Sequence, residues 1–419
     1  MALIKQLLNQ LPTIRQSTLR RKCFTEVHNH IFREIENLVA QRRTLYTELN
    51  QLYVERQQSQ HDFDNARAIK LFIVSIRKNL TSIEQQLMEK LNELPNVLSD
   101  DIPESNVVVK EWRPKTTTGG DNGDAASGLI DLNTASKVSG RNFCYLHDNV
   151  ATLHRALANF MIDQHTNNGY QETYCPYIVQ DHALFNSGQL PKFKDDLFYV
   201  TSQSTPHKNF ILIPTGEVSL VNLLQNRILR LKDLPIKLVT HTPCFRPESA
   251  SYGAKRKGII RQYQFDKVEI VQFVQQSRQH ETLTEMVDQV TNILELLEMP
   301  YHTLLLSADE LSFSAHKSYD VEAWSPVLGQ YVEVSSCSTC DIFQTSRLNC
   351  RLDNSTEQVA SLNASGLAVG RMLKLFLEQH GNDNTIYIPK PLRRYLGGRD
   401  QIIVNKNSLF FKKKKQDNE

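Results

Sequence analysis

Two long stretches without glycine or proline near the start of the chain constrain its fold more than any other feature. In the first, apolar residues recur in steps of three and four, with Arg42 in one slot, at Ile31, Ile35, Leu38, Leu45, Leu49 and Leu52. After a polar interruption at 57–65, the second series is Ile73, Ile76, Leu80, Ile83 and Leu87. Two narrow apolar seams joined by a short polar tip predict an antiparallel two-helix coiled coil. With about 28 residues per helix, this arm would project roughly 40 Å.

The pattern leaves two roles open for such an arm. It has no globular core of its own, so it either contacts another molecule or joins copies of the chain. Residues 1–28 predict a short helical start broken at Pro12, and Leu94-Pro95-Asn96 ends the second helix. The Asp-, Thr- and Gly-rich segment that follows is typical of a linker. We therefore expect an N-terminal domain at 1–98 and a linker at 99–128.

Beyond the linker, the sequence predicts a sheet with helices set against it. Strands are expected at 172–179, 211–220, 237–244, 330–335 and 348–352, and helices at 150–168 and 365–378. Because strands and helices do not alternate regularly, the pattern favours an antiparallel sheet of the α+β class. This domain is expected to span 129–405. The tail at 406–419 carries Lys412 to Lys415, which are either solvated or bind an RNA backbone weakly.

Composition limits the class of protein. The 419 residues suffice for two or three domains, and 40% hydrophobic with 22% charged residues is typical of a globular protein. The apolar runs are too short to span a bilayer, so no membrane association is expected. The net charge of +2 means that any polyanionic partner must meet local basic patches.

The cysteines indicate a reducing compartment. There are seven, scattered and odd in number, which disfavours a disulfide framework. Cys337 and Cys340 have the spacing of a zinc knuckle but lack a second pair, so structural thiols are favoured over a metal site. The first 24 residues contain no acidic side chain and carry Arg15, Arg20 and Arg21. They resemble either a transit peptide or an ordinary amphipathic helix, and we expect a cytoplasmic protein.

The stretch from Thr242 to Glu269 carries the chemistry. It predicts two strands joined by a loop rich in glycine and lysine. Alternation would place five side chains on one surface, namely Arg246, Glu248, Arg261, Phe265 and Glu269. A guanidinium donates two parallel hydrogen bonds to phosphate or carboxylate, and an exposed aromatic ring offers a face on which a base stacks. The alternative is a charged, solvated hairpin.

Read with other segments, this hairpin resembles motif 2 of the class II aminoacyl-tRNA synthetases. Gly366 to Arg371, which predicts an arginine in the first turns of a helix, resembles their motif 3. Tyr170 to Pro176 resembles motif 1, whose proline lies at the dimer interface in that class. Within the class, the chain resembles the seryl-tRNA synthetase family at Thr215-Gly216-Glu217, at Ser187 to Phe193 and at Tyr331 to Ser338. The coiled coil is similar to that family's tRNA-binding arm, so the resemblance covers nearly the whole chain.

The resemblance implies an activity. It is the ATP-dependent ligation of L-serine to tRNA(Ser) through a seryl-adenylate, with release of AMP and pyrophosphate. It also implies a requirement for Mg²⁺ and a homodimer built on class II catalytic domains, and it leaves open whether tRNA(Sec) is charged as well. Serine tRNAs have a long variable arm, which a coiled coil would recognise by shape and backbone.

The resemblance also implies roles for individual residues. Arg246 would clamp the α-phosphate and Arg371 the γ-phosphate as catalytic residues, Glu248 would accept a bond from the adenine amino group, and Phe265 would stack on the base. Glu333 and Ser336 would bind Mg²⁺. The full set implied for ATP is Arg246, Pro247, Glu248, Arg261, Phe265, Glu333, Val334, Ser335, Ser336 and Arg371.

Serine and tRNA are assigned in the same way. Glu269 and Ser365 would bind the serine hydroxyl, because a site that pairs a hydroxyl rejects an analogue lacking it. The serine set is Thr215, Gly216, Glu217, Arg246, Glu269 and Ser365. The tRNA set is Lys255, Arg256 and Lys257 in the loop and Arg33, Arg42 and Arg43 on the arm.

The sequence departs from the family's pattern at three positions. Gly216 stands where alanine or another small residue is usual, Pro247 replaces a small polar residue, and Arg394 stands where proline is usual. Two other functions compete with the ligase. One is a non-catalytic synthetase paralogue, which would have lost active-site residues that are present here. The other is a class II ligase for a different amino acid.

Overall fold

The computed structural model describes seven segments of the chain, 2–21, 25–58, 63–115, 128–201, 210–247, 258–382 and 384–406. Two compact units are distinguished. The first consists of Met1–Leu98 with Ala308–Glu310, and the second of Ser99–Ser307 with Leu311–Glu419.

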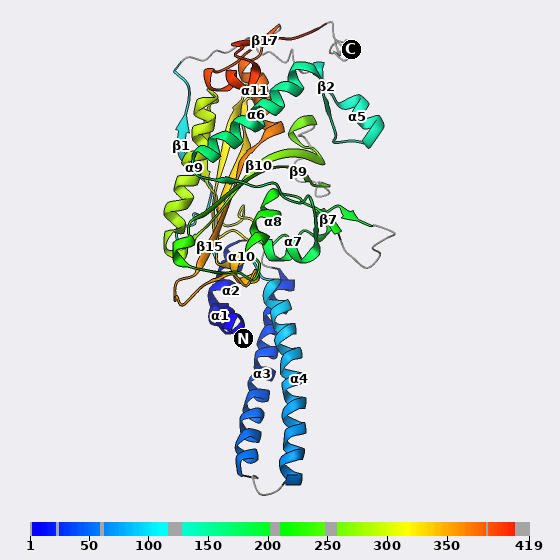
Figure 1. Cartoon of the computed structure of the whole chain (residues 1–419), viewed down its shortest axis with the longest axis vertical. Helices are drawn as coiled ribbons and strands as arrows, with labels where there is room; N and C mark the ends of the chain where they lie inside the picture. The colour runs from blue at the N-terminus through cyan, green and yellow to red at the C-terminus, as the bar shows by residue number, and fades with distance from the viewer. Residues whose placement is uncertain are drawn as a thin grey trace. The chain divides into compact units, whose positions relative to one another are not determined.

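The first unit is helical. Its helices are α1 (Ala2–Asn9), α2 (Leu11–Arg20), α3 (Glu26–Gln58) and α4 (Phe63–Asn92). Pro12 lies in the first turn of α2, where its missing N–H has no intrahelical partner to lose. Helices α3 and α4 run side by side in opposite directions (Figure 1). The predicted antiparallel two-helix arm is confirmed.

Two separate apolar clusters hold the arm together. The base cluster joins both long helices to α1 and α2 and consists of Ile4, Ile14, Ile31, Phe32, Ile35, Leu87, Leu91 and Leu94. The outer cluster is smaller and consists of Leu49, Ile69, Ile73 and Leu80. Between them, Arg42 pairs with Glu84 at 2.8 Å and lies 4.8 Å from the Tyr46 ring centroid. The polar slot in the heptad series is therefore filled by an ion pair across the seam.

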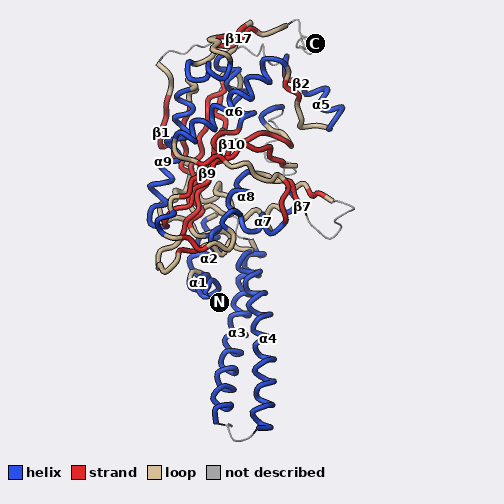
Figure 2. The backbone as a smooth tube through the Cα atoms, in the orientation of Figure 1, coloured by secondary structure: helices blue, strands red, loops and turns tan. Residues whose placement is uncertain are grey.

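The second unit is built on a twisted sheet of eight strands (Figure 2). In spatial order they are β1 (Val107–Trp112), β11 (Tyr301–Leu305), β12 (Lys317–Ser325), β13 (Gln330–Asp341), β15 (Val359–Ala368), β10 (Gln264–Gln275), β9 (Ile236–Phe245) and β4 (Gln171–Glu172). Every neighbouring pair is antiparallel except β4 and β9. The antiparallel α+β class is confirmed.

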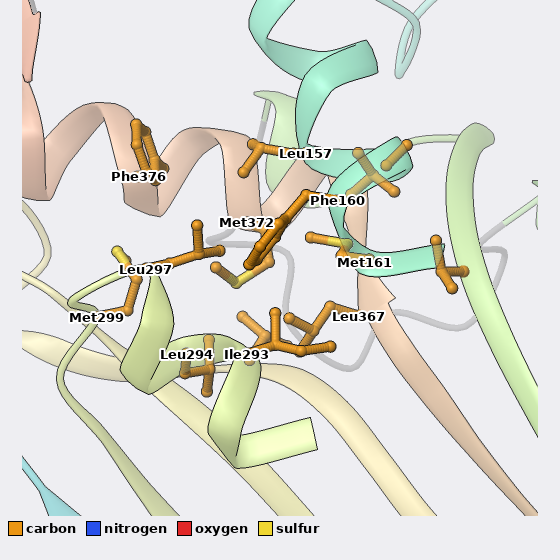
Figure 3. Packing of buried hydrophobic residues seen from close by; sticks show 14 of the residues in the cluster. Leu157, Phe160, Met161, Ile293, Leu294, Leu297, Met299, Leu367, Met372 and Phe376 are labelled. Atoms are coloured by element: carbon orange, nitrogen blue, oxygen red, sulfur yellow. The ribbon is translucent and has the colours of Figure 1, made fainter. Parts of the chain in front are cut away.

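Three helices cover one face of this sheet. They are α6 (Asp148–Asn167), α9 (Gln279–Leu296) and α11 (Val369–His380). Leu157, Phe160, Ile293 and Met372 come from these helices and meet Leu367 of β15 in the main core (Figure 3). Along β10, Val268 and Ile270 point into that core. The residues that alternate with them, such as Lys267 and Glu269, therefore point to the opposite face. The core thus fixes which side chains of β10 face away from the helices.

Shorter elements complete the second unit. The helices are α5 (Leu132–Ser139), α7 (Asp181–Ser187), α8 (Gly216–Val221) and α10 (Phe343–Arg347). The 3₁₀ turns are η2 (Lys194–Asp196), η3 (Asn222–Leu224), η4 (Leu231–Asp233), η5 (Gly258–Ile260), η6 (Gln276–Arg278) and η7 (Lys390–Leu396). The strand pairs are β2 (Ile130–Asp131) with β3 (Tyr145–Leu146), β8 (Ile228–Leu229) with β14 (Arg351–Leu352), and β16 (Thr385–Tyr387) with β17 (Gln401–Ile403). A small sheet joins β5 (Ile178–Gln180), β7 (Phe210–Leu212) and β6 (Tyr199–Val200).

Several expected boundaries differ. The segment expected as a linker at 99–128 contains β1, which pairs with β11, while 116–127 lie outside the described residues. The strand expected at 172–179 is two short strands on either side of Pro176, and that at 211–220 becomes the helix α8 after Leu212. The last strand covers only 351–352. The helix expected from Ser365 begins at Val369, because its apolar start serves equally well in a buried strand.

No helix among the described residues is both long and apolar enough to cross a membrane. The six cysteines that the described segments contain are free thiols, and Cys337 and Cys340 are fully buried on β13. Burial raises the pKa of Cys337 to about 12. In the same segments, no group of three or more His, Cys, Asp or Glu side chains is placed to hold a metal ion. These two cysteines therefore behave as core residues.

Candidate active site

A cavity of about 400 Å³ opens on the sheet face opposite the three helices. It gathers eleven of the expected site residues, namely Thr215, Glu217, Arg246, Arg261, Phe265, Glu269, Glu333, Val334, Ser336, Ser365 and Arg371. Pro247, Gly216 and Ser335 lie beside it without lining it. Glu248, Lys255, Arg256 and Lys257 lie outside the described residues. Arg33, Arg42 and Arg43 belong to the other unit.

The predicted hairpin supplies one wall of the cavity. Strands β9 and β10 pair from Phe245 opposite Gln264, so the strand begins after Arg261 and not at it as expected. The alternation holds from Phe265 onwards, and Phe265, Lys267 and Glu269 all line the cavity. Arg246 lies beyond the end of β9, where its Nε donates to the carbonyl of Pro214 at 3.1 Å. Its guanidinium carbon lies 5.4 Å from the Phe265 ring centroid, so a cation and an aromatic face are presented together.

A buried polar network forms the floor of the cavity. The ammonium of Lys267 pairs with the carboxylate of Glu269, and both side chains are less than a tenth exposed. The Thr215 hydroxyl donates to Glu269 and accepts from Lys267, each at 2.9 Å. The same hydroxyl accepts from the backbone N–H of Glu217 at 3.2 Å and so caps α8. One threonine therefore ties the helix start to the ion pair.

Glu217 carries the clearest electrostatic perturbation in the cavity. Its Oε1 accepts from the side-chain amides of Gln344 at 2.6 Å and Asn363 at 2.9 Å. Burial raises the pKa of Glu217 to about 7, and the neighbouring carboxylate of Glu269 adds to the shift. Glu217 consequently changes its charge near neutral pH, within reach of any ligand in the cavity.

Gly216 is confined by its neighbours. A Cβ at this position would lie 2.9 Å from the Thr240 side chain and 3.2 Å from Glu269 Cβ. Alanine would therefore force the wall of the cavity to move. This close approach accounts for glycine where the family's pattern has another small residue.

Glu269 and Ser365 are opposite each other in the pairing of β10 with β15, although the register shifts just before them. Val268 pairs with Leu367, so Gly366 is an extra residue that bulges from β15. Leu367 has a φ of 138°, which costs a residue with a side chain on the order of 1–3 kcal/mol. The Ser335 hydroxyl donates to the carbonyl of Ser365 at 2.5 Å. The bulge thereby turns Ser365 towards the cavity beside Glu269.

A second bulge shapes the opposite side. Val321 pairs with Ser335 and Glu322 with Glu333, so Val334 is the extra residue on β13. Residues three apart in a regular strand point to opposite faces, yet Glu333 and Ser336 both line the cavity. Arg371, the third residue of α11, lies beside them, with its Nη1 3.5 Å from Glu333 Oε2 and 3.0 Å from the Glu333 carbonyl.

These oxygen donors fit Mg²⁺ as a partial site. Glu333 and Ser336 offer a carboxylate and a hydroxyl, and the Glu333 side chain is 44% exposed. Mg²⁺ binds oxygen and commonly keeps waters and substrate phosphates among its ligands, so two protein ligands suffice when phosphates supply others.

Sequence reasoning missed several residues of the site. Lys267 was given no role, yet it lies two residues before Glu269 in the alternating strand, and this spacing could have revealed an ion pair on one face. Asn363 lies just before the motif 3 resemblance, and Gln189 and Phe193 come from a segment recognised but given no role. Gln344 carried no signal in the sequence, because only the fold brings α10 to Glu217.

On the arm, Arg33 and Arg43 are exposed, whereas Arg42 is half-buried and engaged by Glu84. Arg42 as a tRNA contact stays a prediction, and its guanidinium pairs with Glu84 across the seam.

Comparison with known proteins agrees with this geometry. The model of the tRNA synthetase class II core domain (G, H, P, S and T) matches residues 198–380. The serine–tRNA ligase of Nitrosomonas europaea is 39% identical over 407 residues, covering 88% of this chain and 93% of its own. That of Stutzerimonas stutzeri is 41% identical over 398 residues, with the same coverage.

A solved structure extends the likeness to the whole fold. The seryl-tRNA synthetase from Pyrococcus horikoshii complexed with ATP superposes with a TM-score of 0.80 at 26% identity, covering 96% of this chain and 99% of that one. The chain belongs to the serine–tRNA ligase family of class II aminoacyl-tRNA synthetases.

Proposed function

We propose that this chain performs its family's reaction, the ATP-dependent ligation of L-serine to tRNA, within the 400 Å³ cavity. One observation carries the assignment. Segments as distant as Thr215 and Arg371 bring three arginines, an aromatic face, three buried or half-buried carboxylates and three hydroxyls to one site. This set offers partners for a nucleoside triphosphate and for a small amino acid. It is also the set that a non-catalytic paralogue would lack.

The first step requires positioning more than proton transfer. A serine carboxylate oxygen attacks the α-phosphorus of ATP, the bond to the bridging oxygen breaks, and pyrophosphate leaves. Because the nucleophile is already anionic, no general base is needed, and catalysis comes from alignment and neutralisation of charge. We assign Arg246 to the α-phosphate, Phe265 to stacking on adenine and Arg371 to the γ-phosphate. Arg261 is assigned to the phosphates, and the backbone at Pro247, Val334 and Ser335 to the nucleotide; Glu248 keeps its expected role towards the adenine amino group.

Serine is assigned to the floor of the cavity. Glu269 and Ser365 are opposite each other and would bind the hydroxyl, while Thr215 and Glu217 would bind the ammonium group. Gly216 leaves room for the wall to lie close, which excludes larger side chains. Alanine would leave buried polar groups unpaired, and threonine would clash.

We assign Glu333 and Ser336 to a Mg²⁺ ion. When bound, the ion would neutralise charge on the ATP phosphates. Arg371 lies 3.5 Å from Glu333, and this contact orients the carboxylate.

In the second step, the terminal ribose hydroxyl of tRNA attacks the seryl carbonyl, and AMP leaves. Lys255, Arg256 and Lys257 are proposed to contact phosphates of the acceptor end. Neutralising all three should weaken tRNA charging and spare serine-dependent pyrophosphate exchange. Equal loss of both activities would contradict the assignment.

The arm is proposed to recognise the long variable arm of tRNA(Ser), with Arg33 and Arg43 as the exposed cations among those expected. We propose that 1–98 forms the tRNA-binding domain and 129–405 the catalytic domain, joined at 99–128 and followed by the basic tail at 406–419. The same charging assay with tRNA(Sec) tests the second RNA that the family resemblance leaves open.

We further propose a cytoplasmic homodimer. Free buried thiols support a reducing compartment. Tyr174 is 87% exposed in the segment that resembles motif 1, and a bare aromatic ring beside Pro176 supports an interface there. Light scattering of the purified chain would return twice the monomer mass, and Tyr174→Asp would lower it.

The test of the ligase is pyrophosphate exchange measured with each amino acid in turn, followed by charging of tRNA(Ser). Exchange with serine alone, and charging of that tRNA, would support the proposal. Exchange with another amino acid would indicate a different ligase, and no exchange with any would indicate a binding protein.

A further inference from the structure

A buried histidine lies behind the serine-facing bulge, on the helix side of the sheet. His165 is near the end of α6 and is completely buried. Its Nε2 lies 3.3 Å from the carbonyl oxygen of Gly366, the extra residue of the β15 bulge. Its ring also meets the Tyr170 ring edge-on, with the centroids 5.6 Å apart.

The chemistry of this contact fixes the proton of His165. A carbonyl only accepts, so Nε2 must carry the hydrogen and donate it. Burial lowers the pKa of His165 to about 4, which keeps the ring neutral with this single proton. Its Nδ1 is buried without a hydrogen-bond partner among the described residues. The bond to Gly366 is therefore the polar contact that this ring makes.

Two side-chain hydrogen bonds hold the bulge, one from the neighbouring strand β13 and one from α6. Ser335 donates to the Ser365 carbonyl at 2.5 Å, and His165 reaches the next carbonyl in the chain. A Cβ on Gly366 would lie 2.6 Å from His165 Nε2, so the imidazole occupies the space where a side chain would be. Leu367, with its φ of 138°, follows directly and is packed into the core (Figure 3). A strained backbone of this kind persists only when its surroundings hold it.

We propose that His165 is a positioning residue for amino-acid selection, which fixes the Gly366 bulge so that Ser365 faces the serine hydroxyl. The inference rests on the proposed role of Ser365 in binding serine. It adds a residue on the far side of the sheet that never touches substrate. The consequence is that serine affinity, and discrimination against threonine, depend on a bond made within the core.

The chain offers a matched control in His380. This histidine is also buried, its Nε2 lies 2.8 Å from the Leu297 carbonyl, and burial lowers its pKa to about 4. It lies at the end of α11 and does not line the cavity. Substituting it should cost folding stability in the same way without changing the bulge.

The experiment compares His165→Leu, His165→Gln and His165→Asn with His380→Leu in the full chain. Serine, threonine and ATP are titrated in pyrophosphate exchange, and thermal unfolding is recorded for each variant. A glutamine amide nitrogen can reach the position of Nε2, whereas an asparagine amide falls short. Losing the hydrogen bond from His165 to Gly366 should lower the affinity for serine by about a factor of ten. We expect His165→Leu and His165→Asn to raise the KM for serine about tenfold and to lower the serine-to-threonine ratio of kcat/KM. The KM for ATP should stay within about twofold in all variants.

His165→Gln should recover most of the serine affinity, and His380→Leu should leave it unchanged despite a similar fall in Tm. Gly366→Ala, which pushes the ring away, should reproduce the His165→Leu kinetics. Equal serine KM values in His165→Leu and His380→Leu would overturn the proposal, as would a glutamine variant no better than asparagine. If His165→Leu does not fold, the glutamine and asparagine variants carry the same comparison. If the wild-type chain showed no serine-dependent exchange, the proposed function itself would be refuted.

Discussion

The ammonium of Lys267 pairs with the carboxylate of Glu269, two residues further along β10, and both groups are buried at the floor of the cavity. Their link to Thr215 joins this strand to the start of α8. Substituting one partner of an ion pair that is so well removed from water destabilises the fold, because the other charge is left buried and uncompensated.

We therefore expect Lys267→Met to lower the free energy of unfolding by about 3–5 kcal/mol and to weaken serine-dependent exchange. Denaturant titration measures the first effect. The control is Lys110→Met. The Lys110 side chain is 40% exposed and its ammonium pairs with Asp288 at 3.4 Å and Glu295 at 3.7 Å, so the substitution should cost under about 1 kcal/mol. Adding Glu269→Gln to Lys267→Met should restore part of the stability but not the exchange. A loss no larger than that of Lys110→Met would contradict the importance of this pair.

Because the pKa of Glu217 is raised, we expect serine binding to depend on pH. Its pKa is raised to about 7, so it gains negative charge as the pH rises through neutrality. The KM for serine should fall between pH 6 and 8, because the carboxylate then attracts the ammonium group. Glu217→Gln should give a higher KM that is flat over this range. A wild-type KM that does not change with pH would rule out this role for Glu217.

The same shift affects stability with a defined sign. The folded state holds the Glu217 proton more tightly than the unfolded chain. Protonation of Glu217 therefore adds its full amount to the free energy of unfolding below the unfolded pKa of 4.5, and this amount is lost as the pH rises through about 7. At 1.36 kcal/mol per unit, the loss amounts to about 3 kcal/mol by pH 8.5. Unfolding curves from pH 5 to 8.5 should show this decline in the wild type and not in Glu217→Gln. An identical pH profile for both proteins would count against it.

Glu333→Gln tests the proposed Mg²⁺ site. Replacing the carboxylate by an amide removes the charge that a hard cation prefers, so half-saturating Mg²⁺ in pyrophosphate exchange should rise about tenfold. The KM for serine should stay within about twofold. Glu322→Gln is the control, because this carboxylate on the neighbouring strand pairs with His302 at 2.6 Å and does not line the cavity. An unchanged Mg²⁺ requirement in Glu333→Gln would remove this residue from the metal site.

The two clusters of the arm allow a cleaner truncation than removing it whole. Deleting 45–82 and joining the ends with a short Gly/Ser turn discards the outer cluster and keeps the base cluster folded on α1 and α2. Charging of tRNA(Ser) should fall at least about a hundredfold, while serine-dependent pyrophosphate exchange stays within about twofold. Circular dichroism verifies that the remaining helices persist. Normal charging by the shortened chain would refute the arm's role.

Local patterns were enough to predict the arm and much of the cavity. The heptad series marks α3 and α4 because helix periodicity and the lack of Gly and Pro act over short distances. Phe265 and Glu269 could be placed on one face because strand alternation also needs no knowledge of the partner strand. The antiparallel class followed from the irregular order of strands and helices.

What the sequence could not predict depends on pairing between distant segments. The bulges at Val334 and Gly366 are visible only once β12 and β10 fix the register, and they decide where Ser336 and Ser365 point. The helix expected from Ser365 starts four residues later for the same reason, since pairing with β10 overrides local preference. Gln344 reaches Glu217 across 127 positions, and no local pattern records such a contact.

The ion pair of Arg42 with Glu84 separates the arm into two parts that can change independently. The outer part is held by four buried apolar residues and touches neither α1 nor α2 through its cluster. Matched insertions or losses of seven residues in both helices would keep the seam in phase and leave the base intact. The length of the arm is thus free to follow the length of an RNA partner over evolutionary time, without any change in the catalytic unit.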